Sequence, residues 1–195
     1  MVLAKHIVPP KKLRLILGSG IRTDLFNPTV IDHSKIQQFQ KDLRIPEGCV
    51  IVIMAARLIR TKGVFEYLEA ARIIKQQSHA IKFLLVGNWD KESADALSYD
   101  EINSISKDID WLGMQSDMPT LYALSDICVL PSYYREGIPR VLMEAASMGL
   151  SLISTDMPGC REVVNDGQNG FLIPTRDSKT LASCISRLAA EPELR

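Results

Sequence analysis

The sequence predicts an α/β fold in which helices cover both faces of a doubly wound parallel sheet. Short runs rich in Val, Ile and Leu alternate about six times with helix-like segments along the 195 residues. The run 50–55 is apolar without interruption, which is typical of a strand buried on both faces. Val64, Leu68, Ala71 and Ile74 recur at the spacing of one helix face. This alternation is characteristic of a Rossmann-like domain.

The same two patterns place the other elements. Short runs rich in apolar residues predict strands at 13–17, 50–55, 81–86, 109–112, 127–130, 150–154 and 171–173. Helices are expected at 34–43, 64–77, 99–107, 118–124, 139–148, 160–164 and 178–190. Pro139 is expected at the first helical position, which its fixed backbone suits. Ser178 is expected to cap the last helix.

Length and charge limit the classes of function that the chain can have. The chain is short enough for one domain, 1–195, and its 23 basic and 23 acidic residues give a net charge of zero. A nucleic-acid partner is therefore not expected, because a chain-wide basic surface is missing. No apolar stretch approaches the ~18 residues of a membrane span, and Pro9 and Pro10 interrupt the first segment. We expect a cytoplasmic protein without a signal peptide.

The cysteines and paired aspartates suggest no metal. Cys49, Cys128, Cys160 and Cys184 are far apart in the sequence, which favours structural thiols in a reducing compartment. Asp108 and Asp110 resemble a metal-binding D-x-D pair. They precede the strand at 109–112 instead of following one, so we interpret them as helix-end and turn carboxylates.

Ligands of such sheets bind at the carboxyl ends of the strands, so functional residues are expected in the loops there. The loops concerned are 18–20, 57–63, 87–90, 113–117, 132–139 and 155–162. The first, Gly18-Ser19-Gly20, is not a dinucleotide fingerprint, because Thr23 stands where G-x-G-x-x-G needs glycine. Lys62-Gly63 lacks the upstream glycine of a phosphate-binding P-loop.

The strongest segment runs from Glu136 to Glu144. Gly137 would let a ligand approach the backbone closely, and the helix expected from Pro139 would offer free amides to an anion. Glu144 stands among apolar residues, where a hydroxylated ligand such as ribose could hydrogen-bond it. On the residues alone, the two glutamates could equally be a solvated helix carboxylate and a charged residue of the first turn.

A second pair, Arg57 and Lys62, flanks the loop after the strand at 50–55. Two cations held at the end of a strand could grip a diphosphate from both sides. The alternative is that both are solvated loop cations.

Taken together, the segments resemble the carboxyl-terminal domain of GT-B glycosyltransferases of family 4, the glycosyl transferases group 1 type. The resemblance covers nearly the whole chain. It rests on LGSGIRTDLFNP, MAARLIRTKGVFEYLEAA, FLLVGNWD, WLGMQSDMPTLYALSDICVLPSYYREGIPRVLMEAASMG and STDMPGCREVVNDGQNGFLIP. The spacing of Glu136 and Glu144 is specific in this order and context.

The resemblance implies a role for each site residue. The expected catalytic residues are Arg57 and Lys62, on the diphosphate, and Glu136, on the donor sugar. Glu144 is expected to bind the ribose. Backbone contacts are expected from the domain-junction loop Gly18, Ser19 and Gly20, from Gly87, from the base-pocket rim Gly113 and Met114, and from Gly137 and Ile138 near the sugar and phosphates.

The resemblance also implies a function for the whole protein. The chain would be the donor half of a GT-B enzyme, with the amino-terminal acceptor domain absent from it. The full-length enzyme would be a retaining, metal-independent glycosyltransferase without a cofactor. It would move sugar from a nucleotide-sugar, expected to be a UDP-sugar, to a glycan or lipid-linked acceptor in polysaccharide or lipopolysaccharide synthesis. We expect peripheral association with the inner face of the membrane, and expect this chain alone to be inactive.

Two alternatives stay open at this point. The chain could belong to another GT-B enzyme, such as a nucleotide-sugar epimerase, whose amino-terminal domain would carry its own acid and base. It could also be a non-catalytic module that binds a nucleotide-sugar, in which case the full-length protein would bind tightly without transfer.

Overall fold

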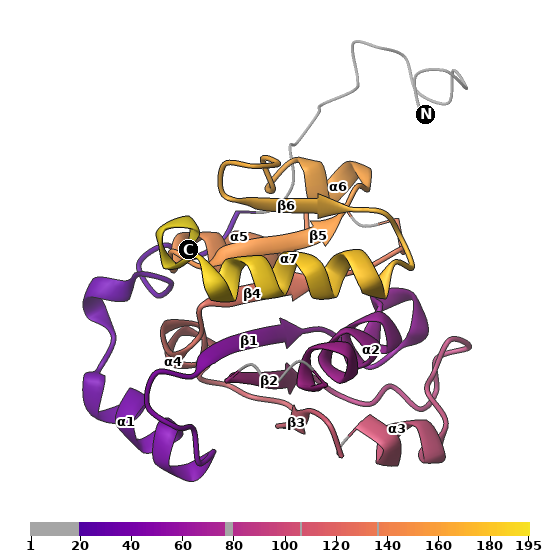
Figure 1. The fold of residues 1–195 in the computed structure, drawn as a ribbon, viewed down its shortest axis with the longest axis horizontal. Helices are drawn as coiled ribbons and strands as arrows, with labels where there is room; N and C mark the ends of the chain where they lie inside the picture. Colours follow the sequence, from indigo (N-terminus) through magenta and orange to yellow (C-terminus); the bar gives the residue numbers. More distant parts are fainter. Residues whose placement is uncertain (1–19, 77–79, 106, 136) are drawn as a thin grey trace, which may run out of the picture.

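The structure is a computed structural model that describes residues 20–76, 80–105, 107–135 and 137–195. In this part of the chain, six parallel strands form one sheet in the order β3-β2-β1-β4-β5-β6 (Figure 1). The strands are β1 (Val50–Ala55), β2 (Ile81–Val86), β3 (Asp110–Trp111), β4 (Ile127–Leu130), β5 (Ser151–Thr155) and β6 (Gly170–Ile173). The predicted doubly wound α/β fold is confirmed.

Helices lie on both faces of this sheet (Figure 1). They are α1 (His33–Asp42), α2 (Val64–Lys75), α3 (Tyr99–Ile105), α4 (Met118–Leu124), α5 (Arg140–Ser147), α6 (Pro158–Arg161) and α7 (Ser178–Ala190). The described residues also form the short 3₁₀ helices η2 (Pro28–Val30), η3 (Arg60–Lys62) and η4 (Pro192–Leu194).

The side chains of β1 explain why its sequence is apolar throughout. Val52 and Met54 pack on the face covered by α2, α3 and α7. Ile51 and Ile53 pack on the opposite face with α4, α5 and α6. Because successive side chains of a strand point to opposite faces, a strand between two helical layers needs apolar residues at every position.

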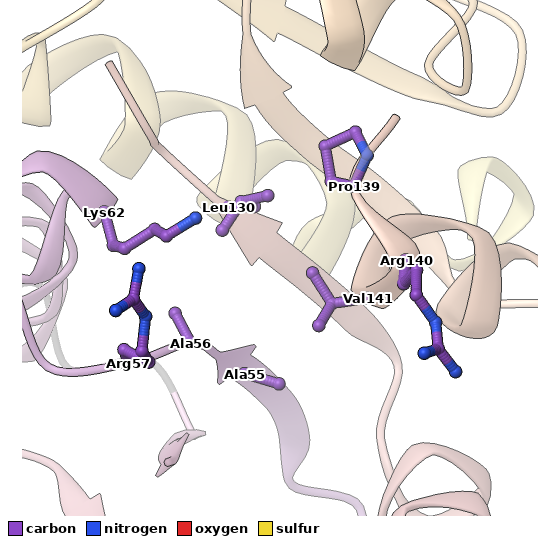
Figure 2. A pocket seen from close by; sticks show the side chains of 8 residues that line it. All are labelled: Ala55, Ala56, Arg57, Lys62, Leu130, Pro139, Arg140 and Val141. Carbon is purple, nitrogen blue, oxygen red and sulfur yellow. The ribbon is translucent and has the colours of Figure 1, made fainter. Parts of the chain in front are cut away.

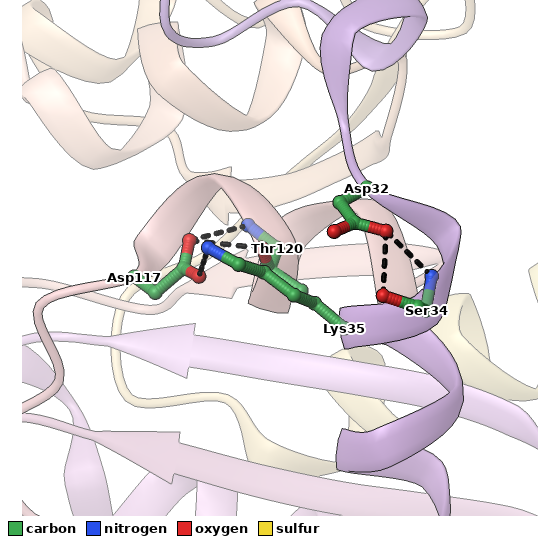
Figure 3. A network of polar contacts seen from close by, with 5 residues as sticks. All are labelled: Asp32, Ser34, Lys35, Asp117 and Thr120. Carbon is green, nitrogen blue, oxygen red and sulfur yellow. Dashed lines mark hydrogen bonds and ion pairs between the residues drawn. The ribbon is translucent and has the colours of Figure 1, made fainter.

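An ion pair links helix α1 to the N-cap of α4, and a carboxylate caps each of the two helices (Figure 3). Asp32 caps α1 by accepting the Ser34 N–H at 2.8 Å, and Asp117 caps α4 through Thr120. Lys35 then joins the two helices, because its Nζ lies 3.2 Å from the Asp117 carboxylate. This contact anchors α1 beside the loop that follows β3.

Several helices and strands begin or end at other residues than the sequence predicted. The expected strand at 109–112 is only the two-residue β3, and the expected helix at 160–164 begins earlier, at Pro158. Pro139 is the N-cap of α5 and not its first helical residue. Asp177, and not Ser178, caps α7, because its carboxylate accepts the Thr180 N–H. The expected strand at 13–17 lies outside the described residues.

Candidate functional site

The strand order places a crevice between β1 and β4. From β1 the chain first builds the sheet outward through β2 and β3, and then returns to the other side of β1 to add β4, β5 and β6. Loops that leave two neighbouring strands toward opposite sides open a crevice at the carboxyl ends of those strands. A pocket of ≈ 210 Å³ lies there (Figure 2). Its lining residues are Ala55, Ala56, Arg57, Lys62, Leu130, Pro139, Arg140 and Val141.

Two cations belong to this pocket. Arg57 stands just beyond β1, and Lys62 is the last residue of η3. Figure 2 shows both side chains on the same side of the pocket, opposite Val141 and Arg140. Arg57 is 59% exposed and pairs with Asp90 at 3.0 Å, so an incoming anion can reach its guanidinium. The structure therefore brings Arg57 and Lys62 to the same pocket at the carboxyl end of β1, as the sequence predicted.

The turn that carries Lys62 is locked against the loop after β4. Gly63 has φ +80°, and a Cβ there would lie 2.2 Å from the carbonyl oxygen of Pro131, so only glycine fits. The Thr61 carbonyl accepts the N–H groups of Tyr133 and Tyr134, at 3.0 and 3.2 Å. The Lys62 Nζ also lies 5.5 Å from the centre of the Tyr134 ring. These contacts fix the position of the backbone from which the Lys62 side chain extends.

The amino end of α5 forms the opposite wall. Pro139, the N-cap, makes no side-chain capping bond, so among the described residues no side chain caps the first amides of the helix. A helix amino terminus attracts anions. Ile138, beside it, is half-buried. Gly137 is exposed, and a Cβ there would meet no atom within 4 Å, so the described protein leaves open space at this position.

Glu144 is not the solvated carboxylate that the sequence left open. Its side chain is 12% exposed, and its Oε1 lies 3.5 Å from a guanidinium nitrogen of Arg140. Burial raises the pKa of Glu144 above its ordinary value, against the smaller opposing effect of Arg140. Nearby, burial and then the charges of Cys128 and Glu144 raise the pKa of Tyr122. The Tyr122 hydroxyl has no hydrogen-bond partner among the described residues.

A second hollow of ≈ 440 Å³ adjoins the first, with Arg57 in both linings. Met114, which lines it, is 66% exposed. Contact of Met114 with a base stays a prediction. Gly113 before it has φ +66°. The remaining lining residues are Asn88, Trp89, Asp90, Lys91 and Glu92.

Gly87 has a structural reason to be glycine. Its φ is +141°, and a Cβ would lie 1.9 Å from the carbonyl oxygen of Ala56, where β1 and β2 end together. Its N–H already donates to the Gly113 carbonyl at 2.8 Å. Ligand contact by the Gly87 backbone stays a prediction.

Other predicted positions can be placed only in part. Gly18, Ser19 and Glu136 lie outside the described residues, and Gly20 is exposed. Sequence reasoning did not single out Asp90, although it named the 87–90 loop; the signal was an acidic residue after β2, near the basic loop after β1. Nor did it single out Arg140 and Val141, which line the pocket.

The paired aspartates and the cysteines lie outside both hollows. Asp108 lies in the turn after α3, as predicted, and pairs with Arg72 at 2.8 Å. Asp110 is not a turn carboxylate, because it begins β3, and it pairs with Lys82 at 2.6 Å. Within the described ranges, no group of three or more His, Cys, Asp or Glu could hold a metal ion. The four cysteines are free, and burial raises the pKa of Cys128 to about 12. Among the helices that the structure describes, none has the length and apolarity to cross a membrane.

Comparison with known proteins now decides the family. A family described as "Glycosyl transferases group 1" matches residues 35–195. The chain belongs to this family. The chain is also 34% identical over 184 residues to the N,N'-diacetylbacillosaminyl-diphospho-undecaprenol alpha-1,3-N-acetylgalactosaminyltransferase of Campylobacter jejuni, covering 94% of this chain and 47% of the relative.

Two further comparisons agree in extent. The UDP-Gal:alpha-D-GlcNAc-diphosphoundecaprenol alpha-1,3-galactosyltransferase of Escherichia coli is 27% identical over 96% of this chain and 48% of its own length. The crystal structure of Anabaena Alr3699/HepE in complex with UDP is 24% identical with a TM-score of 0.80, over 94% of this chain and 50% of that one. The chain spans about half the length of the curated relatives it matches.

Proposed function

We propose that this chain is the donor-binding half of a retaining glycosyltransferase that uses a UDP-sugar and needs no metal. The observation that carries the proposal is the pocket at the switch between β1 and β4, where Arg57 and Lys62 face the amino end of α5. Support for UDP comes from the neighbours: one is named for UDP-Gal, and another was crystallised with UDP.

The chemistry follows from the charges that line the pocket. Transfer of the sugar breaks its bond to the diphosphate, and negative charge grows on the phosphate oxygens. Arg57, Lys62 and the amides at the start of α5 would stabilise that charge, which is the role a metal ion plays elsewhere. Met114 would lie under the base, Glu144 would bind the ribose, and Glu136 would orient the sugar.

We further propose a glycan or lipid-linked acceptor, bound by the part of the full-length protein outside this chain. Two relatives are named for acceptors linked to undecaprenol through a diphosphate, which supports a lipid-linked acceptor and work at the inner face of a membrane. The anomeric configuration of the product of the full-length enzyme, read by NMR, tests retention. An inverted product would contradict it.

Calorimetric titration of UDP into the chain tests the site. Arg57→Ala and Lys62→Ala should each weaken UDP by about 1–3 kcal/mol, because each removes a charge-assisted hydrogen bond to phosphate. Uridine, which has no phosphate, should respond to neither change. Lys41→Ala removes a lysine from the last turn of α1 and should leave UDP affinity unchanged. Equal UDP affinity in the unsubstituted chain and the Arg57→Ala, Lys62→Ala double variant would contradict the proposal, as would binding that EDTA abolishes.

A further inference from the structure

The turn that carries Lys62 is held from its outer side by the segment 88–98, called here the 88–98 loop. The Asp95 carboxylate accepts the Thr61 N–H at 2.7 Å. The backbone carbonyl of the same Asp95 accepts the Arg60 N–H at 3.0 Å, and an antiparallel bridge joins Ile59 to Ala96. One residue of the 88–98 loop therefore binds two successive amides of η3.

The 88–98 loop is itself well anchored. The Trp89 indole donates to the Leu97 carbonyl at 2.8 Å, and the Leu97 side chain is buried. At the start of the loop, the Asn88 carbonyl accepts the Leu58 N–H at 2.9 Å. The 88–98 loop therefore holds Asp95 beside η3, with its carboxylate half-buried.

We propose that Asp95 is a positioning residue that acts through Lys62 and sets the affinity of the site for diphosphate. The first amides of a short helix have no internal acceptor, and Asp95 supplies one to Thr61. On the other side of Thr61, its carbonyl is held by Tyr133 and Tyr134. With both sides of this residue fixed, the next side chain, Lys62, leaves the turn toward the pocket. The inference rests on the proposed function, because it takes Lys62 to be a phosphate ligand.

The charge of Asp95 allows a positioning role to be distinguished from an electrostatic one. A carboxylate near a phosphate site repels the ligand, so a purely electrostatic role predicts that removal of Asp95 tightens binding. A positioning role predicts the opposite sign, because the turn loses the acceptor that fixes it. The direction of one affinity change separates the two.

Inorganic pyrophosphate and UDP, titrated by calorimetry into the purified chain, provide the test. Asp95→Ala should weaken both by about tenfold, as expected when a bond to a charged acceptor is lost. Asp95→Asn should stay within about twofold, because its amide oxygen can still accept from Thr61. Asp95→Glu, which keeps the charge and displaces the oxygens, should be weaker than Asp95→Asn. Asp100→Ala removes an exposed carboxylate from the first turn of α3 and should change nothing.

A double-variant cycle decides whether Asp95 acts through Lys62. In a Lys62→Ala chain, Asp95→Ala should cause no further loss of pyrophosphate affinity. The same tenfold loss in the Lys62→Ala chain would overturn the inference. Tighter pyrophosphate binding by Asp95→Ala in the otherwise unsubstituted chain would overturn it as well. If Lys62→Ala itself leaves pyrophosphate and UDP binding unchanged, the proposed function fails instead. Circular dichroism melting shows that each variant is folded, and Asp95→Glu carries the test if Asp95→Ala is not.

Discussion

Glu144 lies on α5 with its side chain 12% exposed, close enough to Tyr122 for its charge to raise the pKa of that hydroxyl. Among the described residues, the Tyr122 hydroxyl has no hydrogen-bond partner. The one ion-pair partner of Glu144 among the described residues, Arg140, lies 3.5 Å away on the exposed surface of the helix. A carboxylate in this setting costs stability unless something else binds it. A residue kept at such a cost is expected to serve a ligand.

Replacement of Glu144 by glutamine should therefore separate stability from binding. We expect Glu144→Gln to weaken UDP and a UDP-sugar equally, by about tenfold, because both carry the ribose that would bond the carboxylate. The same variant should melt at a higher temperature at neutral pH, since a neutral amide is buried more easily than a charge. Calorimetry and thermal unfolding measure the two effects. Lower stability together with unchanged UDP affinity would contradict the ribose role.

The pH dependence of that stability gain has a defined sign. Burial raises the pKa of Glu144 in the folded chain, so the folded state holds the proton more tightly than the unfolded state does. Stability is therefore lost as pH rises from the ordinary glutamate pKa through the raised one. The advantage of Glu144→Gln should vanish below about pH 4 and be constant once the folded pKa is passed. Denaturant unfolding at a series of pH values checks it.

At the scale of elements, Gly63 joins η3 to α2 and touches the loop after β4. It has two reasons to be glycine: its φ is +80°, and Pro131 occupies the place of a Cβ. Gly149 offers a matched comparison, because its φ is +83° while a Cβ there would meet nothing within 4 Å. The pair separates the cost of backbone strain from the cost of a clash.

Gly149→Ala should lower the free energy of unfolding by about 1 kcal/mol, the cost of a left-handed alanine. Gly63→Ala should lower it by about 3 kcal/mol or more, because the backbone of Pro131 must also move. Only Gly63→Ala should also weaken UDP, since it displaces the turn that carries Lys62. Urea unfolding and calorimetry test the pair. Equal losses of stability would mean that the contact with Pro131 is easily relaxed.

Element boundaries show where sequence reasoning reached its limit. The apolar-rich runs predicted β1 and β2 to the residue. In β1, burial on both faces leaves an uninterrupted apolar signal. Caps were harder to predict, because neighbouring residues compete for them. Asp177 and Ser178 can both cap a helix, and the structure selects Asp177 through its bond to Thr180. Pro139 was predicted one position too far into α5 for the same reason.

At the scale of the whole molecule, alternation of strands and helices was enough to predict the fold class, since it leaves few arrangements besides a parallel sheet. The switch between β1 and β4 depends on which strands pair, and pairing was not readable from the local pattern. The same holds for the site. Arg57 and Lys62 were recognisable near the end of a strand, whereas the contacts of Asp90 and Asp95 arise only when the 88–98 loop folds back on the loop after β1.

The ion pair between Arg57 and Asp90 has a consequence for ionic strength. A diphosphate competes with Asp90 for the positive charge of the guanidinium, so salt weakens the attraction of Asp90 as well as that of the ligand. The chain carries no net charge that would add a long-range pull. We expect UDP affinity to fall less steeply between 50 and about 300 mM salt than two unpaired cations would give. Asp90→Asn should steepen that slope and tighten binding at low salt, whereas Asp110→Asn, which breaks the separate pair with Lys82, should leave the slope unchanged. Asp90 would thus act as a built-in counterion, buffering the site against the salt of its surroundings.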